Sequence, residues 1–358
     1  MLYNNSMRDV ITWLNGWNAG GKISIIWFLI LAGFLVFFAL KIVKQAEVLT
    51  AKTKFGGGLI GGVLIAIITS FPEFITSIEQ SIIGDPGAGS ADNIGANAIS
   101  GFLIGLAALL FIRETFLNRL KKWTIITLWI SFTISLFITL MMFFKTDIII
   151  GSEGHYAIGL VPLILLILYF ILLLLQYKFG NDEEHVLLDE YVKATSVKQA
   201  SWRFLIWGVL LMIGSIGINI SVASMEDGYS ISQESAGGIL LSVAMAIPEG
   251  VAFFAMMKDK QYSSAVAILV GHGFALFVSE WLGDMSYIDA PTYTTEAVHK
   301  VWPISVITTT CFSLLATAPL LGKKFKIFRE NKIVYSIIPI WIILIYIVGW
   351  LLILTLYY

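Results

Sequence analysis

Charged residues are scarce in this chain. Only 13% of its 358 residues are Asp, Glu, Lys or Arg, whereas about a quarter of the residues are charged in a typical soluble domain. Hydrophobic residues make up 58% of the chain, and the mean hydropathy is +0.85. This composition excludes an ordinary soluble domain. It indicates an integral membrane protein that crosses the lipid bilayer several times.

Cysteine, excess positive charge and the common catalytic motifs are missing as well. The one cysteine, Cys311, cannot form an intrachain disulfide. The net charge of -1 argues against nucleic acid as a partner, and no feature of the sequence indicates an obligate protein partner. The chain contains no HExxH zinc motif, GxSxG nucleophile turn or P-loop. We therefore expect neither enzyme activity nor a cofactor.

Ten apolar runs approach the length of about 20 residues that a membrane span needs. They cover residues 23–43, 56–83, 94–112, 123–144, 156–177, 202–224, 236–257, 263–282, 302–322 and 334–357. All ten should be helices, because lipid cannot satisfy an open sheet edge. The polar segment 178–200 separates five spans in residues 1–177 from five in residues 201–358. The expected fold is therefore all-α, with two five-helix repeats joined by a linker.

Lys and Arg are distributed unevenly between the two sides of the membrane that these spans define. Of the 23 such residues, all but four fall in the connections that follow odd-numbered spans. Because positive residues favour the cytoplasmic side, we expect the 178–200 linker inside and both termini outside. The second and seventh spans then run in opposite directions, which makes the two repeats inverted. The compact loops favour a prokaryotic cell membrane.

A Pro-Glu step occurs in the second span and again in the seventh. Pro72-Glu73 and Pro248-Glu249 lie 176 positions apart, one in each half. A charged side chain in the middle of a span costs about 3 kcal/mol, and the proline beside it breaks the helix. Both features serve an inverted-repeat transporter, in which broken helices surround an ion site near the bilayer midplane. The pair therefore indicates an ion transporter.

The residues around these steps resemble a known family. Thr69-Ser70-Phe71-Pro72-Glu73 with Thr76-Ser77, followed by the small-residue segment from Asn93 to Ser100, is similar to the first alpha-repeat of the cation/calcium exchanger (CaCA) superfamily. That superfamily includes sodium/calcium and proton/calcium exchangers. Its ten-helix, five-plus-five inverted fold matches the number and orientation of the spans expected here.

The resemblance implies a cation site with Glu73 and Glu249 as the central carboxylates. Hydroxyl groups of the broken helix and main-chain carbonyls would add oxygen ligands, and two side chains of the third span either bind the ion or tie spans together. These further implied residues are Thr69, Ser70, Asn97 and Ser100, with the carbonyls of Ala66 and Ser242.

Several positions depart from the family pattern. Where the family places a serine and, four residues later, an amide or carboxylate, this chain has Ala96 and Ser100 in one half and His272 and Leu276 in the other. The Thr-Ser pair before the second Pro-Glu has become Met245-Ala246. The lost oxygen atoms favour H+ over several Na+ as the counter-ion. His272 is a candidate proton carrier beside the site.

Two glutamates in one low-dielectric cavity cannot both be ionised cheaply. One divalent cation would neutralise both, as would two protons, so the pair can carry either cargo but not both. Oxygen ligands in irregular geometry suit Ca2+ better than Mg2+. The expected function is thus antiport of a divalent cation, Ca2+ first, against H+ or Na+. The alternatives are a sodium/proton or other cation exchanger of the same fold, and a degenerate membrane protein that binds cations without transporting them.

The sequence also predicts where four acidic residues near the ends of the spans lie. Asp85 and Asp92 should lie in a solvated outer loop, and Glu280 and Asp284 at the membrane interface where the eighth span ends. The linker should contain a short surface helix over residues 184–193.

Overall fold

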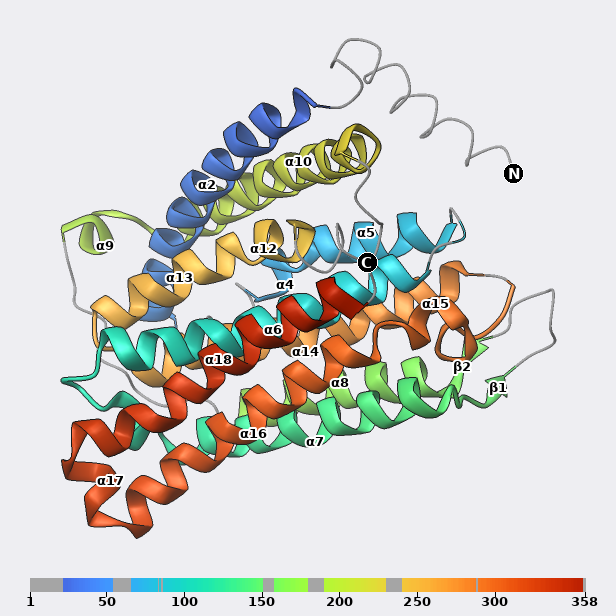
Figure 1. Cartoon of the computed structure of the whole chain (residues 1–358). Helices are drawn as coiled ribbons and strands as arrows, with labels where there is room; N and C mark the ends of the chain where they lie inside the picture. Colours follow the sequence, from blue (N-terminus) through green and yellow to red (C-terminus); the bar gives the residue numbers. More distant parts are fainter. Residues whose placement is uncertain are drawn as a thin grey trace.

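The structure is a computed structural model in which the chain is almost entirely helical (Figure 1). It describes residues 22–53, 66–82, 84, 86–150, 158–179, 190–229, 240–287 and 289–356. The one sheet of this described part is a small antiparallel pair, β1 (Ile149–Ile150) with β2 (Ile158–Gly159). The prediction of an all-α membrane protein is confirmed.

Each of the ten expected spans corresponds to a helical segment. Those of the first half are α2 (Ser24–Lys52), the pair α4 (Ala66–Thr69) and α5 (Phe71–Ile82), α6 (Pro86–Leu110), α7 (Lys122–Phe144) and α8 (Leu160–Phe179). Those of the second half are α10 (Val197–Tyr229), the pair α12 (Ser242–Met245) and α13 (Ile247–Lys258), α14 (Tyr262–Ser286), α16 (Trp302–Lys324) and α18 (Lys332–Leu356). Seven helices within the described ranges are each long and apolar enough to cross a membrane. The other three spans are the shorter α8 and the two broken pairs.

Short helices connect the spans. They are η2 (Phe116–Arg119), α9 (Glu190–Ala194), η4 (Thr292–Thr294), α15 (Glu296–His299) and α17 (Lys326–Glu330). The helix expected at 184–193 corresponds in part to α9, and residues 184–189 lie outside the described residues. The third span starts at Pro86 rather than at residue 94, so α6 is longer at its N-terminal end than the apolar run that predicted it.

The two breaks have the same cause and the same place in each half. Pro72 and Pro248 are the second residues of α5 and α13. A proline has no N–H to donate to the carbonyl of the preceding turn, so the helix is interrupted there. A single turn residue, Ser70 or Ala246, separates each short helix from the next. The sequence similarity of the two Pro-Glu steps is therefore a structural similarity.

The halves pack reciprocally. The first helices of the two halves, α2 and α10, lie side by side, and so do the fourth helices, α7 and α16 (Figure 1). The last helix of each half crosses over to the other half's third helix, α8 to α14 and α18 to α6. Such exchange of equivalent contacts is consistent with two five-helix repeats of inverted topology.

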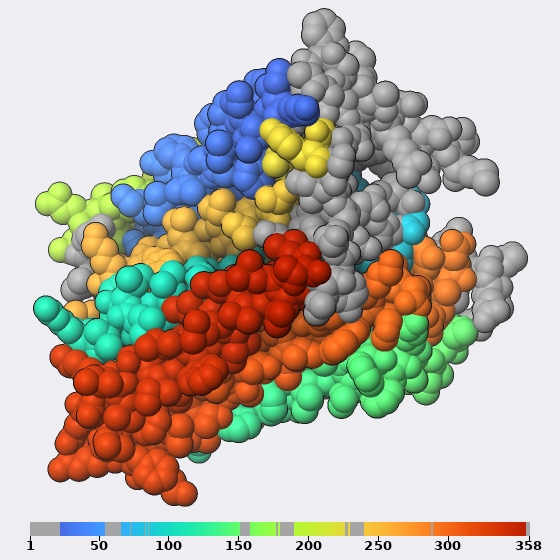
Figure 2. Space-filling model, in the orientation of Figure 1, coloured from blue at the N-terminus to red at the C-terminus, as the bar shows by residue number. Residues whose placement is uncertain are grey.

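Burial distinguishes the central helices from those that face lipid. Most of α14 is buried, whereas most of α2 and α18 is not. Large apolar side chains such as Trp27, Leu29 and Trp341 are exposed on these outer helices. Figure 2 shows α18, in red, lying across one face of the molecule. An apolar surface of this kind is stable in a bilayer, and beneath it α18 packs against α6 and α16.

Candidate cation site

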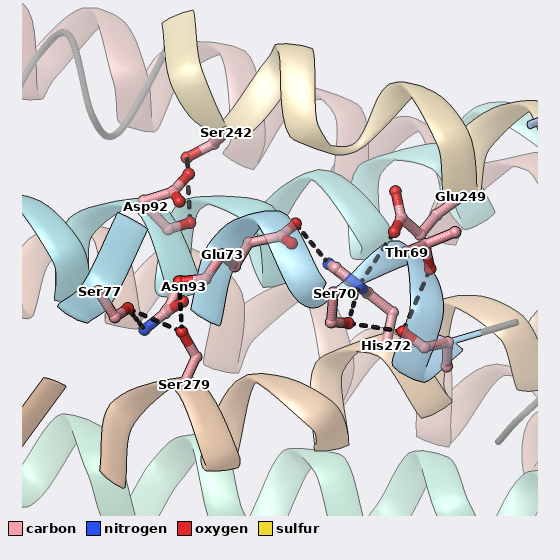
Figure 3. A network of polar contacts seen from close by, with 11 residues as sticks. Thr69, Ser70, Glu73, Ser77, Asp92, Asn93, Ser242, Glu249, His272 and Ser279 are labelled. Atoms are coloured by element: carbon pink, nitrogen blue, oxygen red, sulfur yellow. Dashed lines mark hydrogen bonds and ion pairs between the residues drawn. The ribbon is translucent and has the colours of Figure 1, made fainter. Parts of the chain in front are cut away.

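Three buried ionisable side chains meet where the broken helices face α14 (Figure 3). Glu73 comes from α5, Glu249 from α13 and His272 from α14, and the exposed fraction of each is 0%. One potential ligand atom from each residue lies within 4.8 Å of the others. The structure thus brings together the two glutamates and the histidine that were candidates in the sequence, and both halves contribute to the cluster.

The imidazole of His272 lies between the two carboxylates. Its Nδ1 is 3.2 Å from Oε1 of Glu249, and its Nε2 is 3.6 Å from Oε1 of Glu73. Because the three groups are withdrawn from water, their electrostatic interactions are stronger than they would be at a protein surface.

The broken helix of the first half adds two hydroxyl groups to the edge of this cluster. Ser70 Oγ lies 2.8 Å from Nδ1 of His272 and donates to the main-chain oxygen of Ala66 at 2.8 Å. Thr69 Oγ1 donates to the same carbonyl at 3.2 Å, and its hydroxyl also lies close to Glu249. The Ala66 carbonyl further accepts from the N–H of Ser70 at 3.0 Å. The predicted ligands Thr69, Ser70 and Ala66 therefore lie at the site, with the Ala66 oxygen engaged inside its own helix.

The cluster has few hydrogen-bond donors. Neither carboxylate oxygen of Glu73 nor Nε2 of His272 has a hydrogen-bond partner in the described part of the chain, and the hydroxyl of Thr69 bonds to Glu249. Buried polar atoms without a partner cost roughly 1–3 kcal/mol each, and more when charged. A cation bound between Glu73, Glu249 and His272 would remove that cost, because carboxylate oxygens and an imidazole nitrogen can all act as ligands.

A second polar network extends from Glu73 toward the end of α14. Ser279 Oγ donates to the main-chain oxygen of Glu73 at 2.8 Å and lies 2.7 Å from Ser77 Oγ. Asn93 Nδ2 donates to Ser77 Oγ at 3.1 Å and to Glu280 Oε1 at 2.9 Å. These bonds form a continuous polar contact between α5, α6 and α14. The sequence did not reveal it, because its members are small polar residues on three separate helices.

Glu280 and Asp284, which were expected at the membrane interface, are buried inside the protein near the end of α14. Their exposed fractions are 5% and 1%. Glu280 also accepts a bond from the Tyr293 hydroxyl at 3.3 Å. Asp284 accepts from the main-chain N–H of Gly159 at 2.7 Å and of Thr292 at 2.8 Å. The segments around β2 and η4 fold over this end of α14 and bury both carboxyl groups, which no pattern within α14 predicts.

The expectation that Asp92 is solvated is wrong, and Asp85 lies outside the described residues. Asp92 is 0% exposed on α6. The hydroxyl of Ser242 donates to its main-chain oxygen at 3.1 Å and its Oδ1 at 3.3 Å. The main-chain oxygen of Ser242, a predicted ligand, accepts from the N–H of Ala246 at 3.0 Å. Asp92 therefore links α6 to the second broken helix.

The two remaining candidates are not hydrogen-bonded to the cluster. Asn97 packs against Gly273, where an added Cβ would lie 2.2 Å from the Asn97 oxygen. It lines a small pocket with α7 and α16 residues such as Ser131 and Thr308. Ser100 is buried on α6, and no hydrogen bond joins it to Glu73, Glu249 or His272 within the described ranges.

Comparison with known proteins gives a match to one family over less than half of the chain and a match to one fold over nearly all of it. The sequence profile of the family described as "Sodium/calcium exchanger protein" matches residues 23–178. Structures of the sodium-calcium exchanger NCX_Mj match nearly the whole chain. One, soaked with 2.5 mM Na+ and 0.1 mM Sr2+, has 20% sequence identity and a TM-score of 0.60, covering 92% of this chain and 99% of that one. Another, soaked with 100 mM Na+ and 10 mM Sr2+, has 18% identity and a TM-score of 0.58, covering 92% and 98%. No curated protein sequence matches the chain.

Proposed function

We propose that this chain is a secondary active cation antiporter. It has the fold of the cation/calcium exchanger superfamily, and residues 23–178 have the sequence pattern of the sodium/calcium exchangers. It exchanges a divalent cation, Ca2+ in the first instance, for H+ or Na+. The family consists of transporters rather than enzymes, and NCX_Mj is named as a sodium-calcium exchanger.

The observation that carries this proposal is the buried pair of glutamates. Glu73 and Glu249 come from equivalent breaks in the two halves, and the carboxylate oxygens of Glu73 have no hydrogen-bond partner in the described part of the chain. Two carboxylates match the charge of one divalent ion. In an inverted-repeat transporter the two halves rock around such a site to open it to either side. A site shared between the halves is therefore suited to alternating access.

Further oxygen ligands are proposed from the same breaks. The hydroxyls of Thr69 and Ser70 lie beside the cluster and are placed to turn toward an ion. The carbonyls of Ala66 and Ser242 and the side chains of Asn97 and Ser100 stay predictions.

The counter-ion that fits best is H+. Ala96 and Met245 stand where the family pattern has oxygen-bearing side chains, and both are buried and apolar. A second or third Na+ would need oxygen ligands that these side chains cannot supply. Protons need only the carboxylates.

The membrane arrangement is proposed from the charge distribution. Residues 1–177 and 201–358 form the two repeats, the 178–200 linker is cytoplasmic, and both termini are outside. A prokaryotic cell membrane suits the compact loops.

Reconstitution tests the function. Liposomes that contain the purified protein should accumulate Ca2+ when an outward H+ gradient is imposed, and less when an outward Na+ gradient replaces it. Glu73→Gln and Glu249→Gln should abolish uptake, whereas Glu79→Gln, a partly exposed glutamate on the same helix as Glu73, should not. Wild-type uptake in both glutamine variants would refute the site. Ca2+ binding without uptake under either gradient would instead support the non-transporting alternative.

A further inference from the structure

The contacts of the Ser70 hydroxyl favour one tautomer of His272, the one with its hydrogen on Nδ1. A serine hydroxyl has one hydrogen, and Ser70 Oγ donates it to the Ala66 carbonyl oxygen, which can only accept. The same Oγ lies 2.8 Å from Nδ1 of His272, so this second bond requires the hydrogen on Nδ1. An ionised Glu249 favours the same tautomer, because its Oε1 lies 3.2 Å from Nδ1, and a carboxylate oxygen is attracted by an N–H but repelled by a nitrogen lone pair.

The neutral imidazole therefore directs the bare lone pair of Nε2 into the cluster. Nε2 is buried without a hydrogen-bond partner within the described ranges, and it lies 3.6 Å from Oε1 of Glu73, which also has none. Two acceptors facing each other in a low-dielectric interior repel unless a positive group lies between them. A shared proton does not account for the spacing, because an N–H···O bond spans about 2.7–3.2 Å.

A metal ion does account for it. Zn2+ bonds to imidazole nitrogen and to carboxylate oxygen at about 2.1 Å, which in a tetrahedral site places the two ligand atoms roughly 3.4 Å apart. The separation of Nε2 and Oε1 is 3.6 Å. Metal-binding histidines characteristically donate their other N–H to a fixed acceptor, which holds the ring in place. Ser70 Oγ is that acceptor here.

We propose that Nε2 of His272 is a direct ligand of the transported cation, and that the site consequently binds divalent transition metals of the Co2+ and Zn2+ class more tightly than Ca2+. Imidazole nitrogen suits these metals, whereas Ca2+ and Sr2+ prefer oxygen alone. The inference rests on the proposed antiport and adds to it a nitrogen ligand and a class of cargo. Glu73 and Glu249 supply the charge, and His272 sets the selectivity.

Metal binding to the purified full-length protein tests the proposal without any transport measurement. Co2+ should bind at least tenfold more tightly than Ca2+. His272→Asn, which offers an amide of similar reach but no imidazole, should weaken Co2+ binding at least tenfold and leave Ca2+ binding equal or tighter. The matched control is His299→Asn, which removes a histidine that bonds to the main-chain oxygen of Met142 outside the cluster. It should change neither affinity.

Pulsed electron paramagnetic resonance of bound Mn2+ gives a second readout. The wild type and His299→Asn should show coupling to an imidazole nitrogen, and His272→Asn should not. If His272→Asn does not elute from a size-exclusion column as the wild type does, His272→Gln replaces it in both measurements.

The outcomes separate this inference from the proposed function. Any of four results would overturn the role of His272. In the wild type, this result is tighter binding of Ca2+ than of Co2+. In His272→Asn, it is an unchanged metal preference, an equal loss of affinity for both metals, or nitrogen coupling that persists. The antiport would stand in all of these cases if Glu73→Gln still abolished Ca2+ uptake. Unaltered Ca2+ binding and uptake in Glu73→Gln would refute the proposed site itself.

Discussion

Replacing Glu249 with glutamine should weaken divalent cation binding by orders of magnitude. The substitution keeps the shape of the side chain and removes one of the two carboxylate charges of a site in which Glu73, Glu249 and His272 are all fully buried. Breaking a buried charge pair by removing one partner costs about 3–5 kcal/mol. Since about 1.4 kcal/mol corresponds to a tenfold change in affinity, the Kd for Ca2+ should rise roughly 100- to 4,000-fold. Glu73→Gln should have a similar effect.

The assay is calorimetric titration of Ca2+ into purified protein at neutral pH. The variant should remain folded, because glutamine removes an uncompensated buried charge rather than a packed group. Glu79→Gln serves as the control, since Glu79 also lies on α5 but outside the cluster, and its Kd should stay within about twofold of wild type. A Glu249→Gln protein whose Kd is within threefold of wild type would refute the reasoning, and so would an equal loss of affinity in Glu79→Gln.

Three other predictions concern topology and stability. With an impermeant thiol reagent on intact cells, Lys300→Cys should react and Lys326→Cys should not, both positions being exposed in the fold; equal labelling would contradict the inverted topology. Ser242→Ala should lower the free energy of unfolding by about 1–3 kcal/mol, because the buried Asp92 loses a hydrogen-bond donor; an unchanged melting curve in detergent would show that this bond is unimportant. Burial raises the pKa of Asp147, so the folded state retains its proton to higher pH than the unfolded state and stability should fall as pH rises through that interval. Asp147→Asn should reduce this slope when melting is measured across pH, and an unchanged slope would show that Asp147 does not cause the pH dependence of stability.

The spans and the two breaks could be predicted because each is encoded locally. An apolar run of sufficient length specifies a membrane helix wherever it packs, and a proline interrupts its helix whatever its neighbours are. The start of α6 could not be predicted in this way. Its first turns, from Pro86 to Asp92, consist of small and polar residues, and they are buried because α5, α12 and α15 pack around them.

The candidate site was predictable to the extent that the repeats encode it. Glu73 and Glu249 occupy the same position in two similar segments, and aligning those segments places His272 beside them. The contacts between helices were not predictable. The bond between Ser70 and His272 joins residues 202 positions apart, and the Ser242 hydroxyl reaches Asp92 across 150 positions. Both depend on how the halves dock, which neither periodicity nor motif spacing records.

The site on Glu73 and Glu249 is tested most directly by locating a divalent cation in it. Anomalous diffraction from crystals soaked in Sr2+ should give a peak about 2.6 Å from a carboxylate oxygen of each glutamate, since hard divalent cations bind oxygen at about that distance. The peak should disappear in Glu73→Gln. A Sr2+ peak that lies elsewhere in the protein, or one that persists unchanged in Glu73→Gln, would contradict a cation site shared between the two halves.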